Sequence, residues 1–272
     1  MEFNWQTKDG ITIFGKEWKT ENPKAVIALV HGFGEHCMRY DAMANYYNRK
    51  GYAMIGYDRR GHGQSTGPRG FTPNFEAYLD EVAALIEAGK KRYPGKPIIL
   101  YGHSMGGNIV LNYIIERKPP EISLVVATGP WIRLFKEPPA ITKFIVKLIR
   151  KIAPNLAQHT DLAEYISRVQ EEVDKYKNDP LNHGRMSLNL AGEMFKWSDR
   201  LFYYKGELKI PSLIMHAGED KLTSAEATKA FVNNVSGEVT FRIWEDLYHE
   251  IHNESNREQV YDYTIEWLDK KL

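Results

Sequence analysis

The sequence predicts an α/β fold, in which a mostly parallel sheet has helices on both faces and a helical cap is inserted late in the chain. Short apolar runs with strand character alternate with helical stretches over the first 130 residues, a rhythm typical of parallel sheets covered on both faces. The strand-like runs disappear at about residue 131 and resume at about residue 205. With 272 residues, the chain is long enough for one large domain with such an insertion.

Each element is predicted from its residue pattern. Strands are expected where apolar and β-branched residues form short runs, namely Ile11–Phe14, Ala25–Val30, Tyr52–Tyr57, Pro97–Tyr101, Leu124–Thr128, Ile210–His216 and Val239–Trp244. Helices are expected where apolar residues recur at helical spacing, namely Tyr40–Lys50, Phe75–Ile86, Asn108–Ile115, Ile141–Ile152, Leu162–Lys175, Ala225–Asn234 and a last helix from about Arg257. Thr72, followed by Pro73, is the expected N-cap of the helix around Phe75.

The change of rhythm divides the chain into three parts. Residues 1–130 and 205–272 form the two parts of an α/β core, and residues 131–204 form a helical cap between them. The insertion falls between two strands at the carboxyl side of the sheet, where ligands bind in open α/β sheets. We therefore expect the cap to cover the site.

Composition narrows the function classes and the setting. The formal net charge of +1 provides no basic field for nucleic acid. Cys37 is the only cysteine, which excludes an internal disulfide and fits a reducing compartment. The N-terminal residues lack the cationic and apolar run of a signal peptide, and no apolar stretch approaches the length of a membrane-spanning helix. We expect a cytoplasmic protein.

The most informative motif is Gly-His-Ser-Met-Gly at residues 102–106, after an apolar run and before a helical stretch. This is a G-x-S-x-G turn, whose tight backbone needs glycines on both sides of the serine and exposes the serine hydroxyl above a sheet. Ser104 is therefore the expected nucleophile. The backbone N–H of the next residue, Met105, is expected to face the oxyanion that forms on the substrate.

A serine nucleophile of this kind needs a carboxylate and then a histidine later in the chain. Asp220 is the expected acid, because it follows the strand Ile210–His216 and so projects from the carboxyl edge of the sheet. Asp199 in the cap and Asp246 beside a strand end are weaker candidates. Glu219 is adjacent to Asp220 but would point differently.

His249 is the expected base, because it lies a few residues beyond the strand Val239–Trp244 and one helix and one strand after Asp220. His252 is its main competitor. Histidine pairs often bind metals, but no cysteine or carboxylate cluster at metal spacing accompanies this one, so we expect neither a metal site nor a cofactor. Two roles remain open for His252: support of the leaving group, or surface placement.

A second oxyanion donor is expected from the loop that follows the strand Ala25–Val30. In the sequence His-Gly-Phe-Gly at residues 31–34, the glycines allow the backbone to approach a substrate, and the N–H of Phe33 is the expected donor. His31 is expected to brace this loop. Glu35 follows at once, and it either binds nearby backbone or faces a polar alcohol.

Five motifs together resemble the monoacylglycerol lipase and lysophospholipase family of the α/β-hydrolase fold. They are His-Gly-Phe-Gly-Glu-His at 31–36, Asp-Arg-Arg-Gly-His-Gly-Gln-Ser at 58–65, the serine motif continued to Gly107, Asn-Asp-Pro-Leu at 178–181 in the cap, and Tyr-His-Glu-Ile-His at 248–252. The resemblance covers nearly the whole chain, cap included. It implies a serine carboxylester hydrolase that cleaves monoacylglycerols to fatty acid and glycerol, with Ser104, Asp220 and His249 as its catalytic triad.

The resemblance also implies which residues bind the alcohol part of the substrate, namely Glu35, Arg39, His103, Tyr176 and His252. Phe33 departs from the family pattern, because relatives often carry a small residue there. Lysophospholipids and other amphiphilic esters are the alternative substrates, since the cap decides which alcohol fits. A catalytically dead binding module is disfavoured by the intact order of serine, aspartate and histidine.

The predicted cap helix at 141–152 is amphipathic. Its apolar side carries Ile141, Phe144, Ile145, Leu148, Ile149 and Ile152, and its opposite side carries Lys143, Lys147, Arg150 and Lys151. Two interpretations follow. Either the apolar stripe packs on the core, or the helix makes transient contact with a membrane surface, to which its charges draw it.

Overall fold

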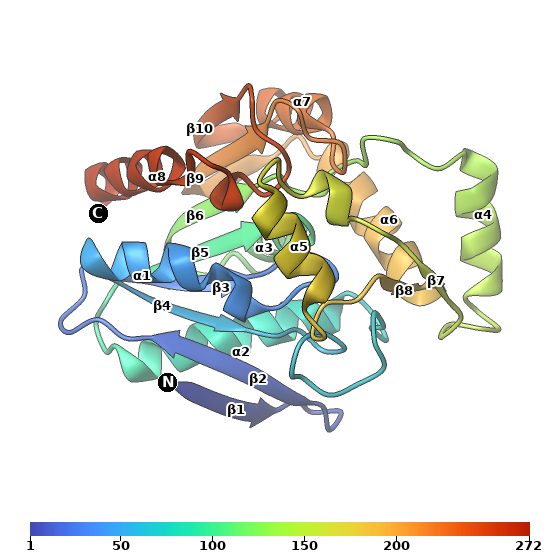
Figure 1. Ribbon diagram of the computed structural model, residues 1–272, viewed down its shortest axis with the longest axis horizontal. Coiled ribbons are helices and arrows are strands. Elements are labelled where there is room, and N and C mark those ends of the chain that lie inside the picture. The colour runs from blue at the N-terminus through green and yellow to red at the C-terminus, as the bar shows by residue number, and fades with distance from the viewer.

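The computed structural model describes residues 1–272, and its centre is an eight-stranded sheet in the order β1-β2-β4-β3-β5-β6-β9-β10 (Figure 1). The strands are β1 (Glu2–Gln6), β2 (Thr12–Trp18), β3 (Ala25–Val30), β4 (Tyr52–Tyr57), β5 (Ile98–His103), β6 (Ile122–Thr128), β9 (Glu207–Ala217) and β10 (Ser236–Trp244). β2 pairs antiparallel with β1 and β4, whereas every pair from β4 to β10 is parallel. The mostly parallel sheet is confirmed.

Helices cover both faces of this sheet. They are α1 (Asp41–Arg49), α2 (Glu76–Arg92), α3 (Met105–Arg117), α7 (Ala225–Asn234) and α8 (Arg257–Lys271). Successive side chains of β3 point to opposite faces, so Val26 and Ala28 join the apolar cluster beneath α2 and α3, and Ile27 and Leu29 join the cluster beneath α1 and α8. Every residue of β3, β4 and β5 is buried, as continuous apolar runs predict. The predicted fold class is confirmed.

Two local predictions differ from the structure. β1 is absent from the predicted elements, although Phe3 and Trp5 alternate with polar residues as in an edge strand. Thr72 is not the N-cap of α2, because its hydroxyl donates to the carbonyl of Asn74 at 2.6 Å. The side chain of Asn74 instead accepts the N–H of Ala77 at 3.0 Å, since it stands at the position from which an amide oxygen reaches the first turn.

The segment between β6 and β9 contains α4 (Ala140–Ile149), α5 (Gln170–Asn178) and α6 (Leu188–Phe202). It also contains a two-stranded antiparallel sheet of β7 (Ala157–His159) and β8 (Arg185–Ser187), where no strand is predicted. The helix predicted from Leu162 begins only at Gln170, after a short 3₁₀ turn at Ala163–Tyr165.

Helix α6 is missing from the predicted elements, although its sequence carries the signal. Its buried residues recur at helical spacing, among them Leu190, Met194, Trp197 and Leu201. The side chain of Ser187 caps the helix by accepting the N–H of Leu190 at 3.1 Å.

Helix α4 stands away from the body of the molecule (Figure 1), and none of its residues is buried. Its apolar stripe faces solvent, with Phe144 exposed to 55%. The interpretation in which this stripe packs on the core is therefore wrong. Part of its charged side faces the cap instead, because Arg150 pairs with Glu193 of α6 and Lys143 pairs with Glu137. None of the helices combines the length and apolar character needed to cross a bilayer.

Candidate active site

Ser104 sits in a strained turn between β5 and α3. Its φ of 55° and ψ of −116° are rare for a residue with a side chain, and such strain persists where neighbouring structure enforces it. A β-carbon on Gly106 would lie 2.0 Å from the carbonyl oxygen of Val30, and one on Gly102 would lie 2.4 Å from the carbonyl of Gly106. The glycines of the motif are thus required by close backbone packing, while Ser104 itself adopts the left-handed conformation.

The structure brings His249 and Asp220 together. The Nδ1 atom of His249 lies 2.6 Å from Oδ2 of Asp220, and both residues are buried. The Oδ1 atom of Asp220 accepts the backbone N–H groups of Leu222 and Thr223 at 2.8 and 2.9 Å. These bonds orient the carboxylate toward the imidazole.

The weaker acid candidates lie elsewhere. Asp199 pairs with Arg133, Glu219 pairs with Lys221, and Asp246 is exposed. Asp220 is the carboxylate that contacts His249.

The His249–Asp220 pair perturbs the pKa of both groups. Burial alone would raise the pKa of Asp220, but the charge of His249 and the hydrogen bonds of His216 and His249 hold it well below its usual range. Burial opposes protonation of His249, yet the Asp220 carboxylate raises the pKa of His249 above its ordinary value of 6.5. Asp220 is therefore ionised at neutral pH and favours the protonated form of His249.

The loop after β3 is fixed on both sides of Gly32. The N–H of Gly32 donates to Oε1 of Glu35 at 2.5 Å, which is the backbone-binding role left open for that carboxylate. His31 Nδ1 donates to the carbonyl of Gly32 at 2.8 Å, because His31 Nε2 accepts the N–H of Arg59. The N–H of Phe33 has no acceptor in the protein. Met105 is the first residue of α3, where amides lack partners within the helix.

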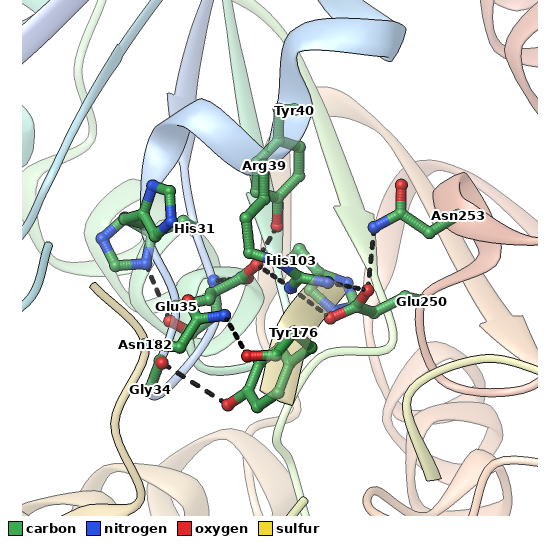
Figure 2. A network of polar contacts seen from close by, with 12 residues as sticks. His31, Gly34, Glu35, Arg39, Tyr40, His103, Tyr176, Asn182, Glu250 and Asn253 are labelled. Carbon is green, nitrogen blue, oxygen red and sulfur yellow. Dashed lines mark hydrogen bonds and ion pairs between the residues drawn. The ribbon is translucent and has the colours of Figure 1, made fainter. Parts of the chain in front are cut away.

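A buried ion-pair network joins this loop to the loop of His249 (Figure 2). Arg39 donates to Oε2 of Glu35 at 2.7 Å and to both carboxylate oxygens of Glu250 at 2.6 and 2.7 Å. The hydroxyl of Tyr40 donates to Glu35 at 2.9 Å, and the side chain of Asn253 donates to Glu250 at 2.8 Å. The two carboxylates are buried and the Arg39 side chain is 8% exposed, so the network holds these charges almost out of contact with bulk water.

The remaining residues implied by the resemblance lie around this network. The ring of Tyr176 packs on the Arg39 guanidinium, and its hydroxyl points to the carbonyl of Gly34 (Figure 2). His103 contacts Thr128 at 3.0 Å, and its ring lies 4.7 Å from those of both His249 and His252. Of the two roles left open for His252, surface placement is wrong, because His252 is fully buried and burial lowers its pKa to about 3.

A pocket of about 660 Å³ is lined by Ser104, His249 and Phe33. Its other walls are largely apolar side chains of the segment between β6 and β9, including Trp131, Leu134, Phe135, Val146, Leu162 and Phe195. The five residues expected to bind the alcohol are not among those that line it. Their contact with a substrate stays a prediction.

A family model described as Hydrolase_4, serine aminopeptidase S33, matches residues 21–256. The chain belongs to this family. As a Hydrolase_4 member it is a serine hydrolase, and its resemblance to the monoacylglycerol lipase family is confirmed.

Among curated relatives of this hydrolase, human monoglyceride lipase is 31% identical over 90% of this chain and 82% of the human protein. Phospholipase YtpA of Bacillus subtilis is 32% identical over 90% of this chain and 95% of its own. An uncharacterised abhydrolase domain-containing protein of Dictyostelium discoideum is 29% identical over 99% of this chain, which spans 29% of that longer relative.

A solved structure gives the same result at the level of the fold. The crystal structure of Paleococcus ferrophilus monoacylglycerol lipase superposes with a TM-score of 0.86 at 28% identity, covering 96% of this chain and 99% of the other.

His216 and Glu250 are two residues of the site that are not among the functional residues predicted from the sequence of this hydrolase. His216 ends β9 four residues before Asp220, and its Nε2 lies 3.1 Å from Oδ2 of Asp220. A histidine at that offset from a predicted acid is the signal that would have found it. Glu250 bears no such signal, because its partner Arg39 is 211 residues away.

We expect the acidic limb of the pH–rate profile to depend on the contacts of Asp220 with His249 and His216. We propose that His249 accepts the Ser104 proton, which only its neutral form can do, so kcat/KM should fall as pH drops through a midpoint above 6.5. His216→Leu removes one hydrogen-bond donor from the Asp220 carboxylate. The negative charge of that carboxylate then acts more strongly on His249, so the midpoint should move to higher pH. His216→Gln keeps an N–H donor and should stay near the parent. Profiles on a soluble p-nitrophenyl ester measure this, and identical midpoints in all three proteins would refute it.

Proposed function

We propose that this hydrolase cleaves monoacylglycerols to fatty acid and glycerol through an acyl-enzyme. The observation that carries the proposal is the apolar pocket of about 660 Å³ into which both Ser104 and the Asp220-paired His249 open. Such a pocket suits a long acyl chain, and a histidine fixed by a buried carboxylate suits a serine nucleophile. The similarity to monoglyceride lipases supports the same substrate class.

Each group has a role in the proposed reaction. Ser104 Oγ attacks the ester carbonyl carbon while His249 Nε2 takes its proton, and the carbonyl oxygen becomes an oxyanion facing the N–H groups of Phe33 and Met105. Collapse of this intermediate expels glycerol, which takes the proton from His249. Water then attacks the acyl-enzyme by the same route and releases the fatty acid.

On the alcohol side, we propose that Tyr176, His103 and His252 lie nearest to the glycerol, while Glu35 and Arg39 hold the loops that flank it. The basis is the ion-pair network: Glu35 and Arg39 already pair with protein groups, Arg39 with both Glu35 and Glu250. Both ring nitrogens of His252 lack a partner and are free for a hydroxyl or a water molecule.

A substrate panel tests the function. Purified protein is assayed with monoacylglycerols of several chain lengths, lysophosphatidylcholine, triacylglycerol and a soluble short ester. We expect the highest kcat/KM on a monoacylglycerol. Preference for lysophosphatidylcholine would favour a lysophospholipase, the second candidate, which the 32% identity to phospholipase YtpA supports. No turnover of any ester would refute both.

We also propose that α4 contacts the membrane surface that supplies the substrate. Its apolar stripe is solvent-exposed throughout, with Ile141 at 62% and Phe144 at 55%, and Ile152 just beyond the helix is exposed to 89%. On the inner side of the helix, Thr142 and Val146 line the pocket. A helix whose outer side enters lipid and whose inner side borders the pocket provides a short path for an insoluble ester.

Replacing Ile141, Phe144 and Leu148 together by glutamine is expected to lower hydrolysis of vesicle-borne monoacylglycerol about tenfold or more, because full withdrawal of even one such side chain from lipid forfeits about 1.5–3 kcal/mol, which is at least about tenfold. Turnover of a soluble short ester should not change. Parallel assays with the two substrates measure the difference, and equal activity on vesicles would contradict the proposal.

Lys147→Gln with Lys151→Gln is the matched control for charge, because Lys143 and Arg150 are already paired within the protein. This double variant should lose only the preference for anionic vesicles, by about 1 kcal/mol per lysine at low salt.

A further inference from the structure

Arg59 is a fully buried arginine behind the expected oxyanion loop. It follows β4 and is 0% exposed. Its Nη1 donates to the carbonyl of His31, and its Nη2 donates to the carbonyl of Gly32 at 2.6 Å. One planar guanidinium therefore holds two successive carbonyl groups of the loop that contains Phe33.

No carboxylate lies within ion-pair distance of this guanidinium, which lies over the ring of Tyr78, 5.7 Å from the ring centre. The half-buried Arg39 pairs with Glu35 and Glu250, and the buried Arg60 pairs with Asp9 and Glu81. Arg59 forms no ion pair, and its Nε has no hydrogen-bond partner. Buried charges in proteins are ordinarily paired, so an unpaired guanidinium here is costly to the fold.

The carbonyl of Gly32 and the N–H of Phe33 are the two ends of one peptide group. That carbonyl accepts both Arg59 Nη2 and His31 Nδ1. A cation hydrogen-bonded to a carbonyl draws electron density toward oxygen and makes the N–H of the same peptide a stronger donor. The Phe33 N–H has no acceptor within the protein, and Phe33 lines the pocket together with Ser104.

We propose that Arg59 is a positioning residue that polarises and fixes the Gly32–Phe33 peptide, so that the Phe33 N–H binds the transition-state oxyanion more strongly. The inference rests on the proposed ester hydrolysis. It explains why a guanidinium without a counterion is kept behind this loop: negative charge arises on the far side of the peptide only during the reaction.

A trifluoromethyl ketone with an alkyl tail gives the test. Ser104 Oγ adds to the ketone carbon, His249 takes the hydroxyl proton, and the ketone oxygen becomes a hemiketal oxygen in the place of the ester oxyanion. The pKa of this hemiketal oxygen, followed by ¹⁹F or ¹³C NMR, reports how well the site stabilises negative charge.

We compare the parent with Arg59→Met and Arg59→Gln, which are neutral, and with Arg59→Lys, which keeps the charge.

The neutral variants should raise the hemiketal pKa by about one unit or more and lower kcat about 10- to 100-fold, with KM changed little, since the lost interaction belongs to the transition state. Arg59→Lys should lie closer to the parent than Arg59→Gln does. Arg60→Met is the matched control: it removes a buried arginine that does not touch the loop, so it should lower stability and leave the hemiketal pKa unchanged.

Equal hemiketal pKa values for Arg59→Gln and Arg59→Lys would overturn the role of the charge. Arg59 would then only hold the loop in place by its hydrogen bonds. This comparison holds even if Arg59→Met does not fold. A parent protein that forms no hemiketal would overturn Ser104 as nucleophile, and hence the proposed function itself.

Discussion

Ser104→Ala, His249→Ala and Asp220→Asn are each expected to lose about 10⁴-fold or more in kcat, because the members of a triad of the proposed kind act as a unit and removal of one disables the others. In Asp220→Asn the pair with His249 at 2.6 Å would be replaced by an amide that no longer fixes the tautomer or stabilises the imidazolium. Steady-state kinetics on a monoacylglycerol and on a p-nitrophenyl ester measure the losses.

Two matched variants separate chemistry from folding. Asp246→Asn changes an exposed acid that the sequence also offered as a candidate, and His159→Ala changes an exposed histidine of β7. Both should retain near-parent kcat, and all five proteins should melt within a few degrees of one another. If Asp246→Asn abolished turnover while Asp220→Asn kept it, the acid would be misassigned.

Arg39→Met is expected to lower the free energy of unfolding by about 3–5 kcal/mol, because it leaves Glu35 and Glu250 as unpaired buried carboxylates. Denaturant unfolding at neutral pH measures the loss. Arg49→Met, which removes an exposed arginine of α1, should stay within about 0.5 kcal/mol of the parent. Adding Glu35→Gln and Glu250→Gln to Arg39→Met should recover much of the loss, since no charge is then left unpaired.

The pH dependence of this effect has a definite sign. In the parent, burial opposes ionisation of Glu250, but Arg39 lowers its pKa from 4.5 to about 2. The stability from that carboxylate is therefore present above pH 4.5 and lost as pH falls toward 2. Without Arg39, burial should raise the pKa of Glu250 above 4.5, so the deficit of Arg39→Met shrinks as acid neutralises the carboxylates. A deficit that is small at neutral pH would show that both groups are already neutral or hydrated there.

The sequence by itself determined the order of the central strands from β2 to β10, the helices that cover them and the position of the serine turn, but not β1, β7, β8 or α6. Buried parallel strands are continuous apolar runs, and β3 and β4 therefore match their predicted bounds. The bounds of helix α7 also match those predicted. The predicted acid and base also meet in the structure, because residues that follow parallel strands in the sheet emerge at one edge. For these features the information is local, in patterns of a few residues and in chain order.

Only the tertiary structure decided which way amphipathic and charged residues face. The periodicity of α4 defines an apolar stripe relative to its own axis, but not whether protein or solvent lies against it, and the stripe proved exposed. The contacts of Arg39 with Glu250 and of Arg59 with the carbonyls of His31 and Gly32 join separate loops of the chain. Such contacts leave no periodic trace in sequence, because they depend on how the loops after β3, β4 and β10 converge, and that convergence is a property of the folded sheet.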